Sequence, residues 1–304
     1  MPDAPLHVPV LLAPIADRAR GCRRVVDATV GHGGHAAAFL DHGATVLGID
    51  RDPDALATAR ERLAGRNVTF LQAPYSSDQA IATVEAFGPD FILLDLGVSS
   101  RQLDQFDRGF TFRTGAPLDM RMGPDAPTAA DWLSDVGEDH LAEVLRDYAD
   151  EPRAKRLARE IVRRQGNAPL ITSDDLVNAI RAVLGPRSGP GDFARIFQGV
   201  RIAVNDELGG LERALPAFRA ALTDGGTLAV ISYHSGEDRL VKREFRAWQQ
   251  GCICPPGLPR CICDKVPLGS SDPRKAIIPL AAEVASNPRA RSAKLRFFRV
   301  DHAG

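Results

Sequence analysis

The chain has 304 residues, of which 44% are hydrophobic and 25% are charged, and its formal net charge is −1. This composition is that of an ordinary globular protein with enough length to bury a core, and the total charge gives no sign of a nucleic-acid partner. No apolar run is long enough to cross a membrane, and the opening MPDAPLHVPVLL lacks the charged region and apolar stretch of a signal peptide. We therefore expect a cytoplasmic protein with no membrane segment.

The N-terminal third of the chain alternates between strand-like and helix-like segments. Pro53 stands at a favoured first position of a helix, and Ser77 can cap another. The repeated β-α pattern predicts a doubly wound α/β sheet of the Rossmann-like type. The predicted strands cover residues 25–29, 44–50, 67–73 and 89–97, and the predicted helices cover residues 35–41, 53–64 and 78–87.

The pattern changes after the fourth strand. Residues 98–124 are rich in Arg, Asp, Gly and Ser, and residues 128–184 then show apolar side chains at helical spacing. A Gly/Pro/Ser linker at 185–192 precedes one or two long helices over 195–222, and a strand-like run returns at 225–235.

This order predicts a helical subdomain inserted into the sheet domain. Its expected bounds are 125–195, between a first part of the sheet domain over 1–124 and a second part over 196–304. Insertions at the carboxyl ends of strands lie over the ligand crevice, so we expect this one to help hold the substrate.

A glycine-rich turn follows the first strand in the run VVDATVGHGGHA, and the second strand ends in Asp50. This pattern is typical of a Rossmann-like nucleoside site, in which the second acid accepts the ribose hydroxyls. Ala36 at the third glycine position does not exclude NAD. Asp27 favours S-adenosylmethionine, because a carboxylate suits its cationic groups and would repel a pyrophosphate. A glycine-rich turn that binds nothing is the alternative.

Several further motifs resemble one family closely. It is the ribosomal RNA small subunit methyltransferase H family, also called MraW, and the resemblance extends from about His7 to Arg299. It implies a class I methyltransferase sheet and the transfer of a methyl group from S-adenosylmethionine to N4 of a cytosine in the decoding region of 16S rRNA. The motifs are HVPVLL (7–12), LLDLGVSSRQLD (93–104), PLDMRM (117–122), RIFQGVRIAVNDEL (195–208), ISYHSGEDRLVKREF (231–245) and NPRARSAKLR (287–296).

The resemblance also implies a set of cofactor-binding residues. The glycines allow close approach of the backbone to the methionine part, and Tyr75 could stack on adenine or be a partly buried core tyrosine. The family more often has Phe at the positions of Tyr75 and Tyr233. The implied cofactor residues are Gly33, Gly34, His35, Asp50, Tyr75, Asp95 and Gln102.

The exocyclic amine of cytosine is a poor nucleophile and needs hydrogen-bond acceptors that hold and orient it. We expect Asp95, or a backbone carbonyl near it, to do this. His234 is a candidate to accept the proton, and a structural histidine at a strand end is an equal alternative. No cysteine stands at the end of the fourth strand, which disfavours methylation at carbon 5.

The expected partner is 16S rRNA in the small ribosomal subunit, and both free rRNA and the assembled subunit stay open as substrates. A basic stretch over 272–299 fits local phosphate contacts, as do arginines and lysines of the insert. A homodimer is also left open. The candidate RNA contacts are Arg101, Arg108, Arg113, Arg121, Arg153, Lys155 and Arg156, with Phe106, Phe110 and Phe112 as candidates for base stacking.

The chain has five cysteines, and four of them form two C-x-C pairs, Cys252 with Cys254 and Cys261 with Cys263. These four could bind Zn²⁺, although C-x₂-C pairs are more typical, or they could be reduced structural thiols. We assign no metal from the sequence. An NAD-dependent oxidoreductase and a non-catalytic RNA-binding factor are the two alternative functions.

Overall fold

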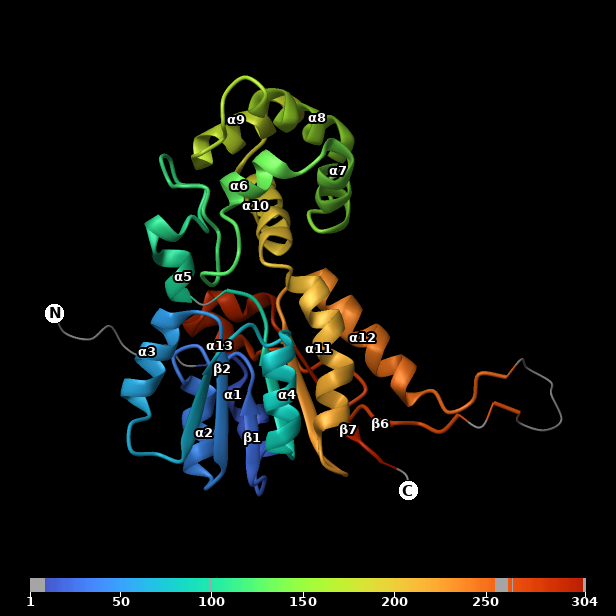
Figure 1. The fold of residues 1–304 in the computed structure, drawn as a ribbon. Helices are drawn as coiled ribbons and strands as arrows, with labels where there is room; N and C mark the ends of the chain where they lie inside the picture. Colours follow the sequence, from blue (N-terminus) through green and yellow to red (C-terminus); the bar gives the residue numbers. More distant parts are fainter. Residues whose placement is uncertain (1–8, 99, 255–261, 264, 303–304) are drawn as a thin grey trace. The chain divides into compact units, whose positions relative to one another are not determined.

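The computed structural model describes residues 9–98, 100–254, 262–263 and 265–302 (Figure 1). The chain forms two compact units. The sheet unit comprises Met1–Gly97 and Gly209–Gly304, and the helical unit comprises Val98–Leu208.

The sheet unit is built on one mixed sheet with the strand order β3-β2-β1-β4-β5-β7-β6 in the described part of the chain. Neighbours from β3 to β5 pair in parallel, whereas β7 pairs antiparallel with both β5 and β6. All residues of β5 are buried, as expected of a strand covered on both faces. The predicted Rossmann-like α/β class is therefore confirmed. The strands are β1 (Arg24–Asp27), β2 (Thr45–Asp50), β3 (Val68–Gln72), β4 (Phe91–Asp95), β5 (Thr227–Ser232), β6 (Gly269–Ser270) and β7 (Lys294–Val300).

Local capping fixes where the helices of this unit begin. The Asp52 carboxylate accepts a hydrogen bond from the N–H of Asp54 at 3.1 Å, and the Ser77 hydroxyl accepts one from Ala80 at 3.2 Å. Both helix starts were predicted. No helix in the described residues combines the length and apolar character needed to cross a membrane. The helices are α1 (Leu12–Arg18), α2 (Gly34–Asp41), α3 (Pro53–Arg62), α4 (Asp78–Phe87), α11 (Glu207–Ala221), α12 (Ser235–Gln249) and α13 (Ala281–Ser286), with a 3₁₀ turn at Pro288–Ser292.

The helical unit packs around its own apolar core and is wider than the predicted insert at 125–195. Upstream of that range, Leu118 and Met120 are buried in this core; downstream of it, α10 contributes side chains as far as Val204. The helix α10 begins at Pro190, within the predicted linker, where the Asp192 carboxylate accepts from the Gly189 N–H. The helices are α5 (Ser100–Asp104), α6 (Ala129–Asp135), α7 (Glu138–Asp147), α8 (Ala154–Gln165), α9 (Ser173–Leu184) and α10 (Pro190–Val204), with a 3₁₀ turn at Phe106–Arg108.

Asn205 connects two of the sequence motifs inside the helical unit. Its amide oxygen accepts from the Met122 N–H at 2.8 Å, and its amide nitrogen donates to the carbonyls of Met120 at 2.8 Å and Arg201 at 2.9 Å. Asn205 is 4% exposed. One buried side chain thus satisfies backbone groups of a segment that has no regular structure of its own, and it joins PLDMRM to the segment RIAVNDEL.

We expect Asn205→Ala to lower the free energy of unfolding by about 2–4 kcal/mol, because the backbone groups of Met120 and Met122 lose a buried partner. Urea denaturation followed by circular dichroism measures this loss. Asn167→Ala, at an exposed position of the same unit, is the matched control and should change stability by less than about 0.5 kcal/mol. Equal effects of the two substitutions would contradict the bridging role of Asn205.

Candidate active site in the sheet unit

Acidic side chains stand at the carboxyl ends of three strands that are neighbours in the sheet. Asp27 ends β1, Asp50 ends β2 and Asp95 ends β4. The strands β2, β1 and β4 are adjacent and parallel, so these residues share one edge of the sheet, where ligands bind in open α/β folds. The sequence placed each acid at a strand end, and the strand order brings them together.

The glycine turn between β1 and α2 depends on conformations that other residues avoid. Gly33 has φ +78°, and a Cβ added there would lie 2.9 Å from Leu63. A Cβ on Gly34 would collide with the ring of Pro9. Packing within the protein therefore requires both glycines. Their predicted role in approaching the cofactor is a separate matter and stays a prediction.

Asp50 is half-buried and held in place by the backbone. Its carboxylate accepts hydrogen bonds from the N–H of Gly31 at 2.8 Å and of Asp52 at 2.9 Å. Burial raises its pKa, and these two N–H groups oppose the rise. A carboxylate has about four lone-pair positions, so the fixed group can still accept hydrogen bonds from a ribose diol.

Asp95 lies in a network that the sequence did not predict. The hydroxyl of Tyr233 donates to its Oδ1 at 2.8 Å, and its own N–H donates to the Thr29 hydroxyl at 2.7 Å. Burial and the neighbouring Asp95 charge raise the pKa of Tyr233 well above its ordinary value, so the tyrosine is a neutral donor. This contact orients the Asp95 carboxylate at the end of β4.

His35 lies beside the same carboxylate, with Nδ1 3.8 Å from Oδ2 of Asp95. Its Nε2 is 3.0 Å from the carbonyl oxygen of Val10, which makes Nε2 the protonated nitrogen of a neutral ring. Burial lowers the pKa of His35 to about 4. His35 and Asp95 therefore do not form an ion pair at neutral pH, and the charge of Asp95 is not cancelled by this ring.

Asp27 is 1% exposed. Neither of its carboxylate oxygens has a partner with hydrogen-bond geometry among the described residues. Burial, followed by the charge of Asp95, raises its pKa to about 8, although the N–H groups of Thr29 and Ala36 act in the opposite direction. A buried carboxyl group beside other acids is costly, and a cationic ligand at this edge would offset the cost.

We expect Asp27→Asn to stabilise the protein increasingly as the pH rises. The wild-type folded state keeps a proton on Asp27 up to about pH 8, whereas the ordinary value is 3.8, so its stability falls as the pH rises between these values. The variant lacks this titration, and the difference in melting temperature should grow by up to roughly 3 °C per pH unit. Thermal melts of both proteins, taken at steps of about one pH unit between roughly pH 5 and 8, measure this difference in melting temperature. Parallel curves for the two proteins would contradict the raised pKa of Asp27.

His234 occupies a structural position at the start of α12. Its Nδ1 accepts from the N–H of Glu237 at 3.4 Å, and the Glu237 carboxylate accepts in return from the N–H groups of Tyr233 at 2.8 Å and His234 at 3.3 Å. Nε2 of His234 is 3.1 Å from the Glu237 carboxylate but lacks hydrogen-bond geometry to it. The H-S-x-E spacing is a capping box, a signal that the sequence contained. The role of His234 as proton acceptor stays a prediction.

The remaining predicted cofactor residues are placed as follows. Tyr75 follows β3, is half-buried, and packs at a ring-centroid distance of 6.5 Å on Phe218 of α11. Gln102 lies on α5 in the helical unit. The role of Tyr75 and Gln102 in cofactor binding stays a prediction.

The candidate RNA contacts differ in environment. Phe112 packs against Phe193 and Phe197 at 5.9 and 6.1 Å, so it is part of the helical core, whereas Phe106 is 40% exposed. In the C-terminal basic stretch, Lys294 and Arg296 both pair with Asp238 of the HSGEDR motif. Phe106 keeps an accessible ring for stacking, and part of the basic stretch is neutralised internally.

The fold and the site define a class of protein. A sheet of this order, with a glycine turn after β1 and a backbone-held acid at the end of β2, has the Rossmann-like arrangement typical of nucleoside-binding enzymes. Residues 4–301 match the model of the MraW methylase family, and the chain belongs to this family. The resemblance inferred from the motifs is thus confirmed.

Individual relatives resemble the chain over its whole length. It is 58% identical over 300 residues to Ribosomal RNA small subunit methyltransferase H of Gemmatimonas aurantiaca, covering 96% of this chain and 95% of that protein. It is 46% identical over 303 residues to the protein of the same name from Heliobacterium modesticaldum, covering 95% and 97%. The solved structure of an rRNA methylase from Streptococcus thermophilus aligns over 99% of each chain, with a TM-score of 0.42 and 12% identity.

Proposed function

We propose that this chain transfers a methyl group from S-adenosylmethionine to N4 of a cytosine in the decoding region of 16S rRNA, in the bacterial cytoplasm. The observation that carries the proposal is the position of three acidic residues beside the glycine turn, at the carboxyl ends of neighbouring strands. These residues are Asp27, Asp50 and Asp95. Membership of the MraW methylase family supports the same reaction.

The residues at this edge fit the proposed cofactor. S-adenosylmethionine carries a ribose diol, a sulfonium and an α-ammonium, and it has no phosphate. The fixed carboxylate of Asp50 suits the diol. A positive charge at this edge would favour the ionised form of the buried Asp27, which has no partner with hydrogen-bond geometry among the described residues. A pyrophosphate would add negative charge beside these buried acids and make their ionised forms still more costly, which favours S-adenosylmethionine over NAD.

Asp95 is proposed to act on the acceptor base. The cofactor supplies an electrophilic methyl group when it is bound, and the exocyclic amine must be held in line with it. Asp95, oriented by the Tyr233 hydroxyl and uncompensated by neutral His35, can accept an N–H of that amine and stabilise the positive charge that develops on nitrogen. His234 remains our candidate to take up the released proton, and its capping contact with Glu237 competes with that use.

The helical unit is proposed to contribute to RNA binding, through its basic residues and the exposed ring of Phe106. The target cytosine must leave its stack to reach the methyl group, and an exposed aromatic side chain can hold a neighbouring base. Phe106→Ala should therefore raise KM for RNA about tenfold with little change in cofactor affinity.

Radiolabelled methyl transfer tests the proposal. The purified protein is incubated with methyl-labelled S-adenosylmethionine and either small subunits lacking methylation or free 16S rRNA, with 23S rRNA as the control. Label in 16S rRNA from one or both substrates, and none in 23S rRNA, is the expected result. Binding of the cofactor without label in any 16S rRNA would contradict the RNA assignment, and stabilisation by NAD but not by S-adenosylmethionine would contradict the cofactor.

A further inference from the structure

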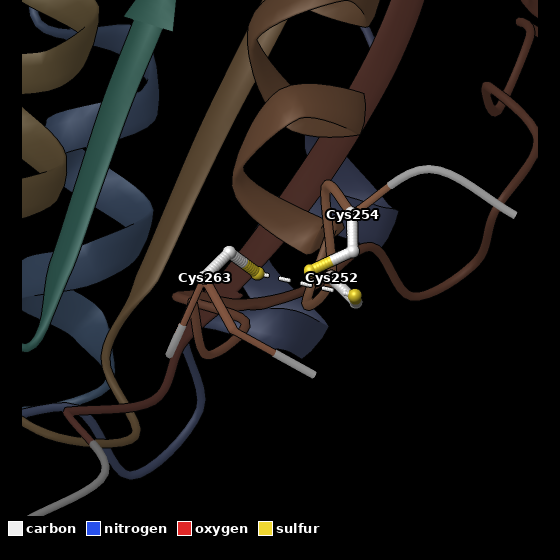
Figure 2. Close-up of side chains that lie close together, drawn as sticks. All are labelled: Cys252, Cys254 and Cys263. Carbon is white, nitrogen blue, oxygen red and sulfur yellow. Dashed lines mark hydrogen bonds between the residues drawn. The ribbon is translucent and has the colours of Figure 1, made fainter. Parts of the chain in front are cut away.

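Three cysteines converge in the segment between α12 and β6. The sulfurs of Cys252, Cys254 and Cys263 all lie within 4.8 Å of one another, and Figure 2 shows the three side chains close together. We refer to these residues as the cysteine cluster. Cys261, the remaining member of the two C-x-C pairs, lies outside the described residues.

The C-x-C spacing explains why the sulfurs meet. In an extended chain, residues two apart project to the same side and the residue between them projects to the other side. Ile253, between Cys252 and Cys254, is accordingly turned outward and 57% exposed, and Ile262, next to Cys263, is 73% exposed. Placing two large apolar side chains in water is unfavourable, so burial of apolar surface is not what brings the cysteines together.

Backbone N–H groups point at two of the sulfurs. The N–H of Ile253 donates to Sγ of Cys263 at 3.5 Å, and the N–H of Ile262 donates to Sγ of Cys254 at 3.4 Å. Each of these bonds runs from one C-x-C pair to the other. Backbone N–H groups in these positions can donate to a metal-bound sulfur, and the thiolate is the form of cysteine that binds metals.

The spacing of the sulfurs suits a shared metal ion better than a disulfide. Sγ of Cys252 and Sγ of Cys263 are 3.9 Å apart, whereas a disulfide requires about 2.05 Å. Thiolates bound to Zn²⁺ at about 2.3 Å with tetrahedral angles are separated by about 3.8 Å. Sulfur-only donors also select soft metals such as zinc over Mg²⁺ or Ca²⁺.

The base of this segment is anchored on the sheet unit by hydrogen bonds, whereas its described apolar side chains farther out are exposed. The N–H of Leu268 donates to the carbonyl of Trp248 at 2.8 Å, and the Gln249 amide exchanges hydrogen bonds with Ser271. Beyond this base, Val266 is 55% exposed, like the two isoleucines. A metal crosslink would supply the constraint that apolar burial does not.

We propose that the cysteine cluster binds one structural Zn²⁺ ion that links the chain at Cys252 and Cys254 to the chain at Cys263. The thiol protons are released to solvent on binding, and no electron transfer is involved. The site lies apart from the carboxylates of the candidate active site in sequence, and the inference does not rest on the proposed function.

Metal analysis of the full chain tests this site. Protein purified with a reductant and without chelators should hold about one zinc per chain by mass spectrometry of the metal. Cys252→Ser, Cys254→Ser and Cys263→Ser should each lower the zinc retained after dialysis about tenfold. Cys22→Ser is the matched control, since Cys22 lies outside the cluster, and it should keep the wild-type content.

A second readout applies even if a serine variant folds poorly. Cobalt titrated into reduced, metal-depleted wild-type protein should give thiolate-to-cobalt charge-transfer absorption and the visible bands of a tetrahedral ion. The proposal is overturned if reconstituted wild-type protein holds less than about a tenth of an equivalent of zinc and shows neither absorption. It is equally overturned if the Cys22→Ser protein loses zinc as completely as the cluster variants.

Discussion

Asp95→Asn is expected to lower the methyl-transfer rate at saturating S-adenosylmethionine by about 10³-fold. The carboxylate accepts an N–H of the target amine and stabilises the charge that develops on it, and the amide offers neither the charge nor the second acceptor oxygen. Single-turnover kinetics with labelled cofactor measure the rate. Because the cofactor is saturating, a loss caused only by weaker cofactor binding would not appear in this rate.

Tyr233→Phe is the matched control for this substitution. It removes the hydroxyl that donates to Asp95 at 2.8 Å but keeps the carboxylate. The resemblance to the family implies that Phe is usual at this position, so we expect a loss of no more than about tenfold. A wild-type rate for Asp95→Asn, or equal losses for the two variants, would remove Asp95 from the chemical step.

Asp50→Ala is expected to weaken binding of S-adenosylmethionine by about 10²- to 10³-fold. The substitution removes the acceptor proposed for the ribose hydroxyls and also the group that holds the N–H donors of Gly31 and Asp52. Isothermal titration calorimetry measures the affinity. Asp54→Ala, an exposed acid nearby, should bind the cofactor normally.

The outcome for Asp50→Ala separates ligand binding from folding. Circular dichroism and the melting temperature report whether the glycine turn and the sheet survive the substitution. A folded variant with an affinity within about threefold of the wild type would show that Asp50 does not contact the cofactor.

The sequence predicted most of the sheet unit because its signals are local. Pro53 and Ser77 mark helix starts, and the uninterrupted apolar residues of β4 mark a strand covered on both faces. The bounds of the helical unit are less local. Leu118 and Met120 enter its core from a stretch without helical or strand periodicity, so pattern alone places the boundary too late.

In the candidate site, too, local sequence signals predict some features, whereas others depend on tertiary contacts. Each acid was predicted from the end of its own strand, but the contact between Tyr233 and Asp95 depends on β5 pairing with β4, and these strands are separated by the whole helical unit. The capping role of His234 was readable from the spacing to Glu237, yet the sequence left proton acceptor and structural histidine as equal alternatives. Where a side chain can have either a structural or a chemical role, sequence patterns alone do not decide between the two.

Nucleoside mass spectrometry of 16S rRNA, digested after reaction with the purified protein and S-adenosylmethionine, identifies the atom that is methylated. We expect N4-methylcytidine from the wild-type protein, confined to the decoding region, and none from the Asp95→Asn variant over the same time. 5-Methylcytidine, a methylated purine, or N4-methylcytidine formed equally by the variant would contradict the proposed reaction at Asp95.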